Sequence, residues 1–344
     1  MVKTLPKRVI VLIPTLNEAR HIDAVLTQLL SQDTFGQQTR VIVADGGSDD
    51  GTQTIVEKAS TRFPNVELRH NPGRTQACAM NMLLASEFAS YDIAVRCDAH
   101  AAYPPDFISR LITELDRQPD VSSIVIPMDA VPDGNYFRRG LALVADSKLG
   151  AGGSPHRGGV KSGFVDHGHH AAFRLDAFRT LGGYDTRFIA NEDAEFDRRL
   201  IGSRHKIWLD ANIRIGYFPR DTLGGLWRQY YRYGIGRAQN CLKHGDIPAL
   251  RQMIPVVHVL LLVFSMLLLP FSIAGLIWPV FYVLLLGVVA IQTAAKHKTL
   301  CGLIALPALA AMHTAWGSGF LIGLFRNLTR RETQSASAMS HTES

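Results

Sequence analysis

The sequence contains few cysteines, and their spacing does not suit a metal site. Its 344 residues include only four, Cys78, Cys97, Cys241 and Cys301, with none of the C-x-x-C pairs typical of zinc sites. We therefore expect four free thiols rather than a disulfide scaffold. Charged residues are also scarce at 19%, whereas a hydrophobic content of 47% excludes an intrinsically disordered chain.

The scarcity of charge is confined to the C-terminal part of the chain. Residues 252–295 contain no Asp, Glu, Lys or Arg over 44 positions, and residues 299–325 contain none over a further 27. A helix needs roughly 20 apolar residues to cross the hydrocarbon core of a bilayer. These runs predict two or three membrane helices, whereas buried helices of a large soluble core are the weaker alternative. The predicted spans are Met253–Leu269, Leu276–Ala295 and Leu300–Phe325.

Basic residues around the predicted spans indicate their orientation, because Lys and Arg favour the cytoplasmic side. One group precedes the first span, one follows the second, and one follows the third. A two-helix hairpin keeps all three groups in the cytoplasm, whereas three passes, the arrangement we favour, place the last group outside. A re-entrant last segment is the alternative. The groups are Arg228, Arg232, Arg237, Lys243 and Arg251; Lys296 and Lys298; and Arg326, Arg330 and Arg331.

The N-terminal part alternates short apolar strands with amphipathic helices at 18–30, 52–60 and 74–87. This alternation predicts an α/β domain with a parallel sheet, whose ligands bind beyond the carboxyl ends of the strands. Three of those ends carry polar residues, at Asn17 and Glu18, at 45–52 and at 98–100. The predicted strands are Val9–Ile13, Val41–Ala44, Val66–Arg69 and Ile93–Arg96.

Acidic side chains at these strand ends suit a cation rather than a bare phosphate. A divalent metal that bridges a carboxylate and a diphosphate satisfies both partners. Asp98 is the leading candidate ligand, and His100 is a second ligand or holds a metal-bound water. Imidazole favours Mn²⁺ slightly over Mg²⁺. The alternative makes Asp98 a turn-former and His100 a surface residue.

Two other classes of protein are disfavoured. No Gly-x-Gly-x-x-Gly follows the strand Val9–Ile13, which argues against a dinucleotide-dependent dehydrogenase. The basic residues lie next to the predicted membrane region, and the predicted ligand site is acidic, which argues against nucleic-acid binding. The short run Val9–Ile13 is also too short for the apolar core of a cleavable signal peptide, so we expect the N-terminal domain to stay in the cytoplasm.

Five short segments occur in the order known from one enzyme family. Together they resemble family 2 glycosyltransferases, which have the GT-A fold, a Rossmann-like nucleotide-diphospho-sugar transferase domain. Within that family, residues 98–106 and 232–238 are most similar to bacterial exopolysaccharide transferases of the succinoglycan-biosynthesis type. The five segments are Ile13–Glu18, Val43–Thr52, Asp98–His100, Gly182–Asp185 with Asn191–Asp193, and Gln229–Tyr233.

The resemblance implies four regions and a nucleotide site. The regions are a catalytic GT-A domain at 1–222, an amphipathic interfacial segment at 223–251, a membrane region at 252–326 and a disordered polar tail at 327–344. Asp45 would accept the uracil N3–H, while Asp98 would contact the ribose or the metal and His100 the metal. His100 replaces the second acid of the family's Asp-x-Asp motif, and polypeptide N-acetylgalactosaminyltransferases also use Asp-x-His with a metal. The nucleotide pocket would be lined by Pro14, Thr15, Asn17 and Glu18.

The resemblance also implies the catalytic residues. Asp193, next to Glu192, would be the general base of an inverting transfer, whereas a helix cap with a first-turn acid is the structural alternative. Gln229, Arg232 and Tyr233 would close over the diphosphate and the acceptor, with Arg232 neutralising charge on the leaving UDP. Aromatic and basic residues alternate around this motif, which is also typical of a helix at a membrane surface.

Three histidines, His167, His169 and His170, lie on a probable strand before Asp193. Successive strand residues point to opposite faces, so we expect no zinc site and place His169 or His170 in the acceptor groove.

The expected protein is a metal-dependent, inverting hexosyltransferase of exopolysaccharide biosynthesis. It would move a hexose, with glucose favoured, from a UDP-sugar to a polyprenyl-diphosphate-linked oligosaccharide. The expected location is the bacterial inner membrane, multi-pass, where other polysaccharide-assembly proteins are potential partners. A polyprenyl- or dolichyl-phosphate sugar transferase is the first alternative, and a non-catalytic assembly partner with a transferase-like fold is the second.

Overall fold

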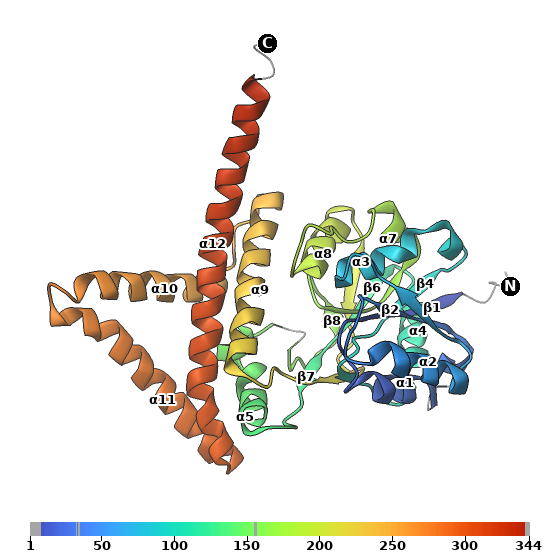
Figure 1. Ribbon diagram of the computed structural model, residues 1–344, viewed down its shortest axis with the longest axis horizontal. Helices are drawn as coiled ribbons and strands as arrows, with labels where there is room; N and C mark the ends of the chain where they lie inside the picture. The colour runs from blue at the N-terminus through green and yellow to red at the C-terminus, as the bar shows by residue number, and fades with distance from the viewer. Residues whose placement is uncertain (1–7, 32, 34, 155–156, 341–344) are drawn as a thin grey trace. The chain divides into compact units, whose positions relative to one another are not determined.

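The computed structural model describes residues 8–31, 33, 35–154 and 157–340, and the side chains of the last helix as far as residue 326. The chain forms two compact units, which we call the sheet unit and the helical unit (Figure 1). The two segments Ala130–Gly153 and Phe188–Asn191 belong to the helical unit, although they lie within the predicted domain 1–222. The sheet unit is Met1–Asp129, Ser154–Arg187 and Glu192–Phe218, and the helical unit is Ala130–Gly153, Phe188–Asn191 and Pro219–Ser344.

The sheet unit is built on an eight-stranded sheet with the order β3-β2-β1-β4-β9-β6-β10-β8. Strands β3, β2, β1 and β4 are parallel, whereas β9 runs antiparallel to both β4 and β6. The strands are β1 (Val9–Thr15), β2 (Arg40–Asp45), β3 (Val66–His70), β4 (Ile93–Arg96), β6 (Val121–Ile126), β8 (Gly163–Phe164), β9 (His169–Arg174) and β10 (Lys206–Leu209). A second sheet pairs β5 (Ala101–Ala102), β11 (Ile215–Tyr217) and β7 (Met128–Ala130).

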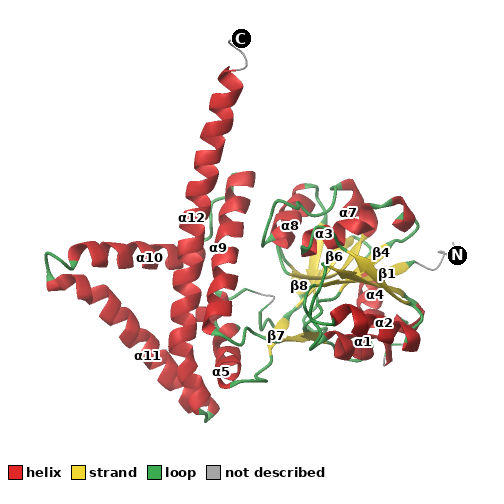
Figure 2. Ribbon diagram, viewed as in Figure 1, coloured by secondary structure: helices red, strands yellow, loops and turns green. Residues whose placement is uncertain are grey.

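Helices cover both faces of the large sheet (Figure 2). Alternate residues of β1 face opposite ways, so Val11 and Ile13 pack in one core and Ile10 and Leu12 in the other. One face carries α1 (Ile22–Ser31), α2 (Thr52–Arg62) and α4 (Phe107–Arg117), and the other carries α3 (Gln76–Asn81), α7 (Leu175–Thr180) and α8 (Glu192–Gly202). Short 3₁₀ turns are Gly36–Gln38, Met82–Leu84 and Ser86–Phe88.

The four predicted strands and the helices at 18–30 and 52–60 are confirmed, each within a few residues. The predicted helix at 74–87 is shorter, because α3 ends at Asn81. The Asn81 amide donates to the Tyr184 carbonyl oxygen at 2.8 Å, and its Oδ1 accepts from the Tyr184 N–H at 2.8 Å. These two hydrogen bonds hold the end of α3 at Tyr184, which lies 103 residues further along the chain.

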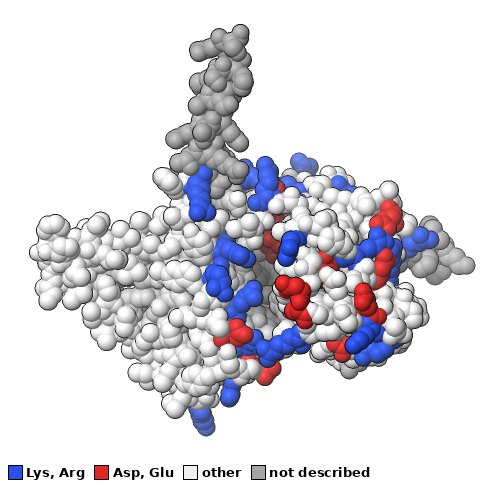
Figure 3. Space-filling view, in the orientation of Figure 1, with Lys and Arg blue, Asp and Glu red and all other residues white. Residues whose placement is uncertain are grey.

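The helical unit contains three helices that are long and apolar enough to cross a membrane, at Leu250–Leu268, Ile273–His297 and Leu300–Arg326. This confirms the predicted spans by length and composition. Figure 3 shows a broad face over α10 and α11 without charged side chains. The helices are α5 (Tyr136–Ala145), α6 (Lys148–Ala151), α9 (Leu223–His244), α10 (Leu250–Leu268), α11 (Ile277–His297) and α12 (Ala305–Ser340), with 3₁₀ turns at Ile273–Leu276 and Leu300–Ile304.

Helices α9 and α12 run side by side and approach closely at glycines (Figure 1). A Cβ at Gly234 on α9 would overlap the carbonyl oxygen of Trp316, and a Cβ at Gly319 on α12 would overlap that of Tyr231. We call these contacts the glycine seam. The backbone of α12 is helical through Ser340, and the disorder expected for the tail at 327–344 stays a prediction.

Candidate active site

The loops after β1 and β2 are joined by hydrogen bonds between side chains and backbone. Asn17, at φ 58°, accepts from the Asp49 N–H at 3.0 Å through Oδ1, and its own N–H donates to Ser48 Oγ at 2.8 Å. The Glu18 N–H donates to Thr52 Oγ1 at 2.9 Å. These contacts bring together two of the three predicted polar strand ends. Thr15 is buried at the end of β1, and its hydroxyl donates to the Ile13 carbonyl oxygen at 3.0 Å, whereas Pro14 is half-buried.

Asp45 contributes more to the structure of its own loop than the sequence indicated. Its side chain is only 2% exposed and accepts hydrogen bonds from the N–H groups of Gly47 and Ser48, the Ser48 hydroxyl and the Gln53 amide. Burial opposes ionisation of Asp45, yet these hydrogen bonds lower its pKa. Asp45 therefore builds the turn itself, and its contact with a nucleobase stays a prediction.

The third strand end joins the first two through His100. Its Nδ1 lies 2.7 Å from Oε1 of Glu18, and the Glu18 side chain is 18% exposed while that of His100 is 45% exposed. The residues expected at the nucleotide and at the metal therefore touch each other. This convergence follows from the order β2-β1-β4, which sets the three carboxyl ends side by side.

Asp98 lies between a buried arginine and a buried histidine. Arg96, 4% exposed, donates to Oδ1 of Asp98 at 3.1 Å, and Nε2 of His169 lies 3.6 Å from Oδ2. Burial opposes ionisation, but Arg96 and the two nearby histidines hold the pKa of Asp98 well below its usual range. Burial lowers the pKa of His169 to about 4, so its imidazole is neutral at pH 7.

Glu192 and Asp193 are the first two residues of α8, and their pKa values are shifted in opposite directions. Burial and the adjacent Asp193 raise the pKa of Glu192, whose Oε1 accepts from the Gln76 amide at 2.9 Å. Burial also opposes ionisation of Asp193, but His167 and Arg96 lower its pKa below the usual value. A pair whose pKa values are pushed apart in this way is a recognised feature of catalytic sites.

One turn beyond Asp193, Asp197 holds two histidines. Its Oδ2 lies 2.7 Å from Nδ1 of His167, and its Oδ1 lies 2.6 Å from Nε2 of His170. The other ring nitrogen of His170 lies 2.6 Å from the hydroxyl oxygen of Tyr184. His170 is fully buried in this network, so it does not line an acceptor groove, whereas His169 lies at Asp98.

Sequence reasoning missed Arg96, Gln76 and Asp197. Arg96 carried a signal, because a charged residue at the end of an otherwise apolar strand needs a partner, and Asp98 follows two residues later. Gln76 and Asp197 carried none, since each meets its partner only through the packing of helices α3 and α8.

The donor set at Asp98 and His100 fits a metal that takes most of its ligands elsewhere. Among the residues described, no group of three or more His, Cys, Asp or Glu side chains is arranged to hold a metal ion. One carboxylate and one imidazole are nevertheless ligands that Mn²⁺ accepts. The phosphate oxygens of a bound nucleotide and water would complete such a site.

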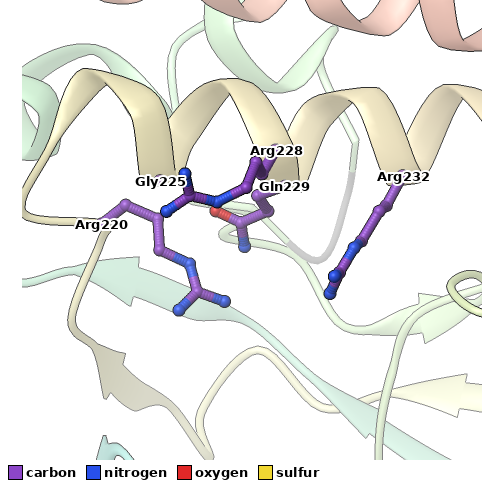
Figure 4. A pocket seen from close by; sticks show the side chains of 5 residues that line it. All are labelled: Arg220, Gly225, Arg228, Gln229 and Arg232. Atoms are coloured by element: carbon purple, nitrogen blue, oxygen red, sulfur yellow. The ribbon is translucent and has the colours of Figure 1, made fainter.

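The remaining predicted residues lie on α9 in the helical unit. Gln229 and Arg232 line a pocket together with Arg220, Gly225 and Arg228 (Figure 4). The Gln229 amide donates to the hydroxyl of Tyr233 at 2.9 Å, which orients both side chains on neighbouring turns of the helix. The motif residues Gln229, Arg232 and Tyr233 therefore share one face of α9.

Comparison with known proteins gives consistent results. The profile of Glycosyl transferase family 2 matches residues 10–182. Succinoglycan biosynthesis protein ExoA of Rhizobium meliloti (strain 1021) is 38% identical over 311 residues, covering 90% of this chain and 93% of that protein. Dolichyl N-acetyl-alpha-D-glucosaminyl phosphate 3-beta-D-2,3-diacetamido-2,3-dideoxy-beta-D-glucuronosyltransferase of Methanococcus voltae is 25% identical over 236 residues, covering 66% of this chain and 72% of that protein.

Among solved structures, the fold is similar to mannosyltransferase PcManGT from Pyrobaculum calidifontis, solved in complex with GDP-Man and Mn²⁺. The TM-score is 0.56 at 21% identity, over 94% of this chain and 88% of that one, so the likeness concerns the fold alone. With the family profile and the 38% identical relative, it leads to one conclusion: the chain is a member of glycosyltransferase family 2 with the GT-A fold.

Proposed function

We propose that this glycosyltransferase moves a hexose, with glucose favoured, from a UDP-sugar to a polyprenyl-diphosphate-linked oligosaccharide during exopolysaccharide synthesis. The observation that carries the proposal is the 38% identity with a succinoglycan biosynthesis protein over almost the whole length of both chains. The lowered pKa of Asp193 keeps its carboxylate ionised, and an ionised carboxylate is the state that a general base requires.

In this mechanism Asp193 is the general base of an inverting transfer. Its carboxylate accepts the proton of the acceptor hydroxyl while the hydroxyl oxygen attacks C1 from the face opposite the diphosphate. The C1–O bond to the diphosphate breaks, and UDP leaves with the bonding electrons. Glu192, held by the Gln76 amide, lies next to Asp193, and burial together with that neighbour raises its pKa.

The departing UDP is stabilised by positive groups. Arg232 neutralises charge that develops on the diphosphate, and Gln229 and Tyr233 support it on α9. Asp98 and His100 would hold a divalent metal, which supplies further charge neutralisation at the phosphates when bound. Pro14, Thr15, Asn17, Glu18 and Asp45 border the nucleotide in this proposal.

A lipid phosphate acceptor is the second candidate. The Methanococcus voltae relative is named as acting on a dolichyl sugar phosphate, that is, on a lipid-linked sugar with a single phosphate. Both candidates place the reaction at a membrane, and we propose the bacterial inner membrane with the sheet unit in the cytoplasm. The three apolar helices and the basic residues that flank them support this location.

The test is transfer of radiolabelled sugar by the full-length protein in nanodiscs. UDP-sugars are compared one at a time on extracted lipid-linked acceptors, with EDTA and with added Mn²⁺. We expect label in the lipid fraction, loss of transfer in EDTA and recovery with Mn²⁺. No transfer from any UDP-sugar, or full activity of Asp193→Asn, contradicts the proposal. UDP release without labelled lipid indicates a soluble acceptor instead.

A further inference from the structure

The pocket on α9 contains more positive charge than the family motif supplies. Arg232 belongs to the Gln-x-x-Arg-Tyr motif, but Arg220 and Arg228 do not. Figure 4 shows the side chain of Arg228 extending toward Arg220 beside Gln229, the Arg220 guanidinium directed away from α9, and Arg232 one turn further along the helix. Gly225 forms part of the wall, where a Cβ would lie 3.7 Å from that of Arg220.

Arg220 and Arg228 have no anionic partner within the described part of the chain, and both side chains are exposed. Several other arginines do have an acidic partner: Arg214 pairs with Asp129, Arg199 with Glu195, and Arg138 with Asp221. Guanidinium groups that line one pocket without a counter-ion repel one another, so their placement there indicates an anionic ligand.

The chemistry of the pocket suits a diphosphate. A guanidinium binds a phosphoryl group through two parallel N–H donors, so two of them match two linked phosphoryl groups. Gln229 adds an amide donor on the same helix face, because residues 225, 228, 229 and 232 follow the helical repeat. A single phosphate would make both guanidinium groups share its three terminal oxygens, whereas a diphosphate offers each of them a phosphoryl group.

The position of the pocket favours a lipid over a nucleotide as the source of that diphosphate. Arg220 and α9 belong to the same compact unit as the three apolar helices, and α9 packs along α12 at the glycine seam. Trp227, 40% exposed beside Arg228, is the kind of aromatic side chain enriched at membrane interfaces. We infer that Arg220 and Arg228 bind the diphosphate of the lipid-linked acceptor, which deepens the proposed function and rests on it.

This assignment separates two roles within one pocket. Arg220 and Arg228 hold the acceptor before and after transfer, so they contribute equally to ground-state and transition-state binding. Arg232 acts on the leaving UDP and contributes to the transition state. Loss of Arg220 or Arg228 therefore raises the acceptor KM, whereas loss of Arg232 lowers kcat.

The kinetic test uses full-length protein in nanodiscs with Arg220→Gln, Arg228→Gln and the double variant. We expect the KM for a lipid-diphosphate acceptor to rise about tenfold in each single variant and further in the double, with kcat and the UDP-sugar KM within about threefold. Arg228→Lys keeps the positive charge but lacks the planar guanidinium, so its acceptor KM should lie between those of the wild type and Arg228→Gln. Arg139→Gln, an exposed arginine on α5 of the same unit, is the matched control and should be unchanged.

A binding arm does not depend on catalysis. Farnesyl diphosphate, farnesyl monophosphate and UDP are each titrated calorimetrically against wild-type and double-variant protein. We expect the wild type to bind the farnesyl diphosphate more tightly than the monophosphate, and the double variant to lose that preference while binding UDP normally. If the wild type transfers no sugar but shows this preference, the proposed function fails while this inference stands.

Three outcomes overturn the inference. The first is a rise in the UDP-sugar KM at a constant acceptor KM, which assigns the pocket to the nucleotide. The second is that both KM values stay constant in the double variant, and the third is that farnesyl diphosphate binds equally well to the wild type and the double variant.

Discussion

Oδ1 of Asp197 lies 2.6 Å from Nε2 of His170, and both side chains are fully buried. Asp197 is on α8, one helical turn after Asp193. The same carboxylate holds His167 through its other oxygen. Burial opposes ionisation of Asp197, but the two histidines lower its pKa. The network therefore stabilises the segment that presents the candidate base.

Replacement of Asp197 by Asn should lower the melting temperature of the full-length protein, because one charge-assisted partner of each histidine is lost. We expect about 3 kcal/mol of destabilisation at pH 7.5, as for other broken buried pairs. A carboxyl with a lowered pKa stabilises above its unfolded pKa and loses that stabilisation as the pH falls. The difference in melting temperature should therefore persist down to about pH 4 and shrink below it, because the unfolded pKa of an Asp is about 3.9. An equal difference at pH 7.5 and at about pH 3 contradicts this account, and Asp120→Asn, at an exposed site, serves as the control.

Asp193→Asn should lower kcat by 100- to 10,000-fold, which is about the usual contribution of a general base. The UDP-sugar KM should change little, because Asn keeps the size of the side chain and the donor binds elsewhere in the proposal. Steady-state kinetics on the lipid-linked acceptor measure both constants. A fall in kcat of less than tenfold assigns the base to another residue.

Glu192→Gln should stabilise the protein at alkaline pH. Burial raises the pKa of Glu192 from 4.5, so the wild type loses stability as the pH rises through the folded pKa and a charge must be buried. Gln removes the charge and its Oε1 can still accept from Gln76. The melting temperatures of variant and wild type should coincide near pH 4.5, with the variant higher at pH 8. A variant that melts lower at pH 8 excludes this interpretation.

The α10–α11 hairpin should cross the membrane while α12 stays on the side of α9. Exposed large apolar side chains are dense on α10 and α11, but within residues 305–326 of α12 only Ile322 and Phe325 are of this kind. In Leu300–Arg326, 50% of the most apolar stretch is buried inside the protein, against 22% in Leu250–Leu268 and 17% in Ile273–His297. Figure 1 shows α10 extending sideways from α12 rather than along it, so the two cannot both follow the membrane normal.

This topology keeps all three basic groups on one side, which three passes do not. Phe271→Cys, in the exposed turn between α10 and α11, should react with an impermeant maleimide on intact cells in a Cys78→Ser background. A C-terminal reporter and Asp120→Cys should react only after permeabilisation. Labelling of the C-terminal reporter in intact cells supports three passes instead.

The sequence predicts the first half of the fold well because its strands are continuous apolar runs. Val9–Ile13 and Val41–Ala44 are apolar on both faces, which is typical of strands buried inside a parallel sheet. The antiparallel insertion of β9 between β4 and β6 is different, because His169–Arg174 carries polar and apolar residues whose partners lie far away in the chain.

The candidate site likewise contains residues whose positions the sequence predicts and residues whose positions it does not. Glu18 and His100 were predicted at neighbouring strand ends, since the order of strands decides that proximity. The hydrogen bonds of Asp45 within its own turn were not predicted, because sequence alone does not tell whether an Asp accepts from its own loop or from a ligand. Asp197 could not be found at all, since its histidines come from another strand and loop.

The glycine seam also has a consequence for the lipid-linked acceptor that we propose. Gly234 and Gly319 lock α9 against α12 at backbone distance, so α9 cannot slide along its neighbour without steric overlap. The arginines of α9 are thereby kept at a constant depth relative to the apolar helices. If the proposed acceptor binds at these arginines, it would be recognised at its diphosphate, and the number of isoprene units beyond the diphosphate should matter little.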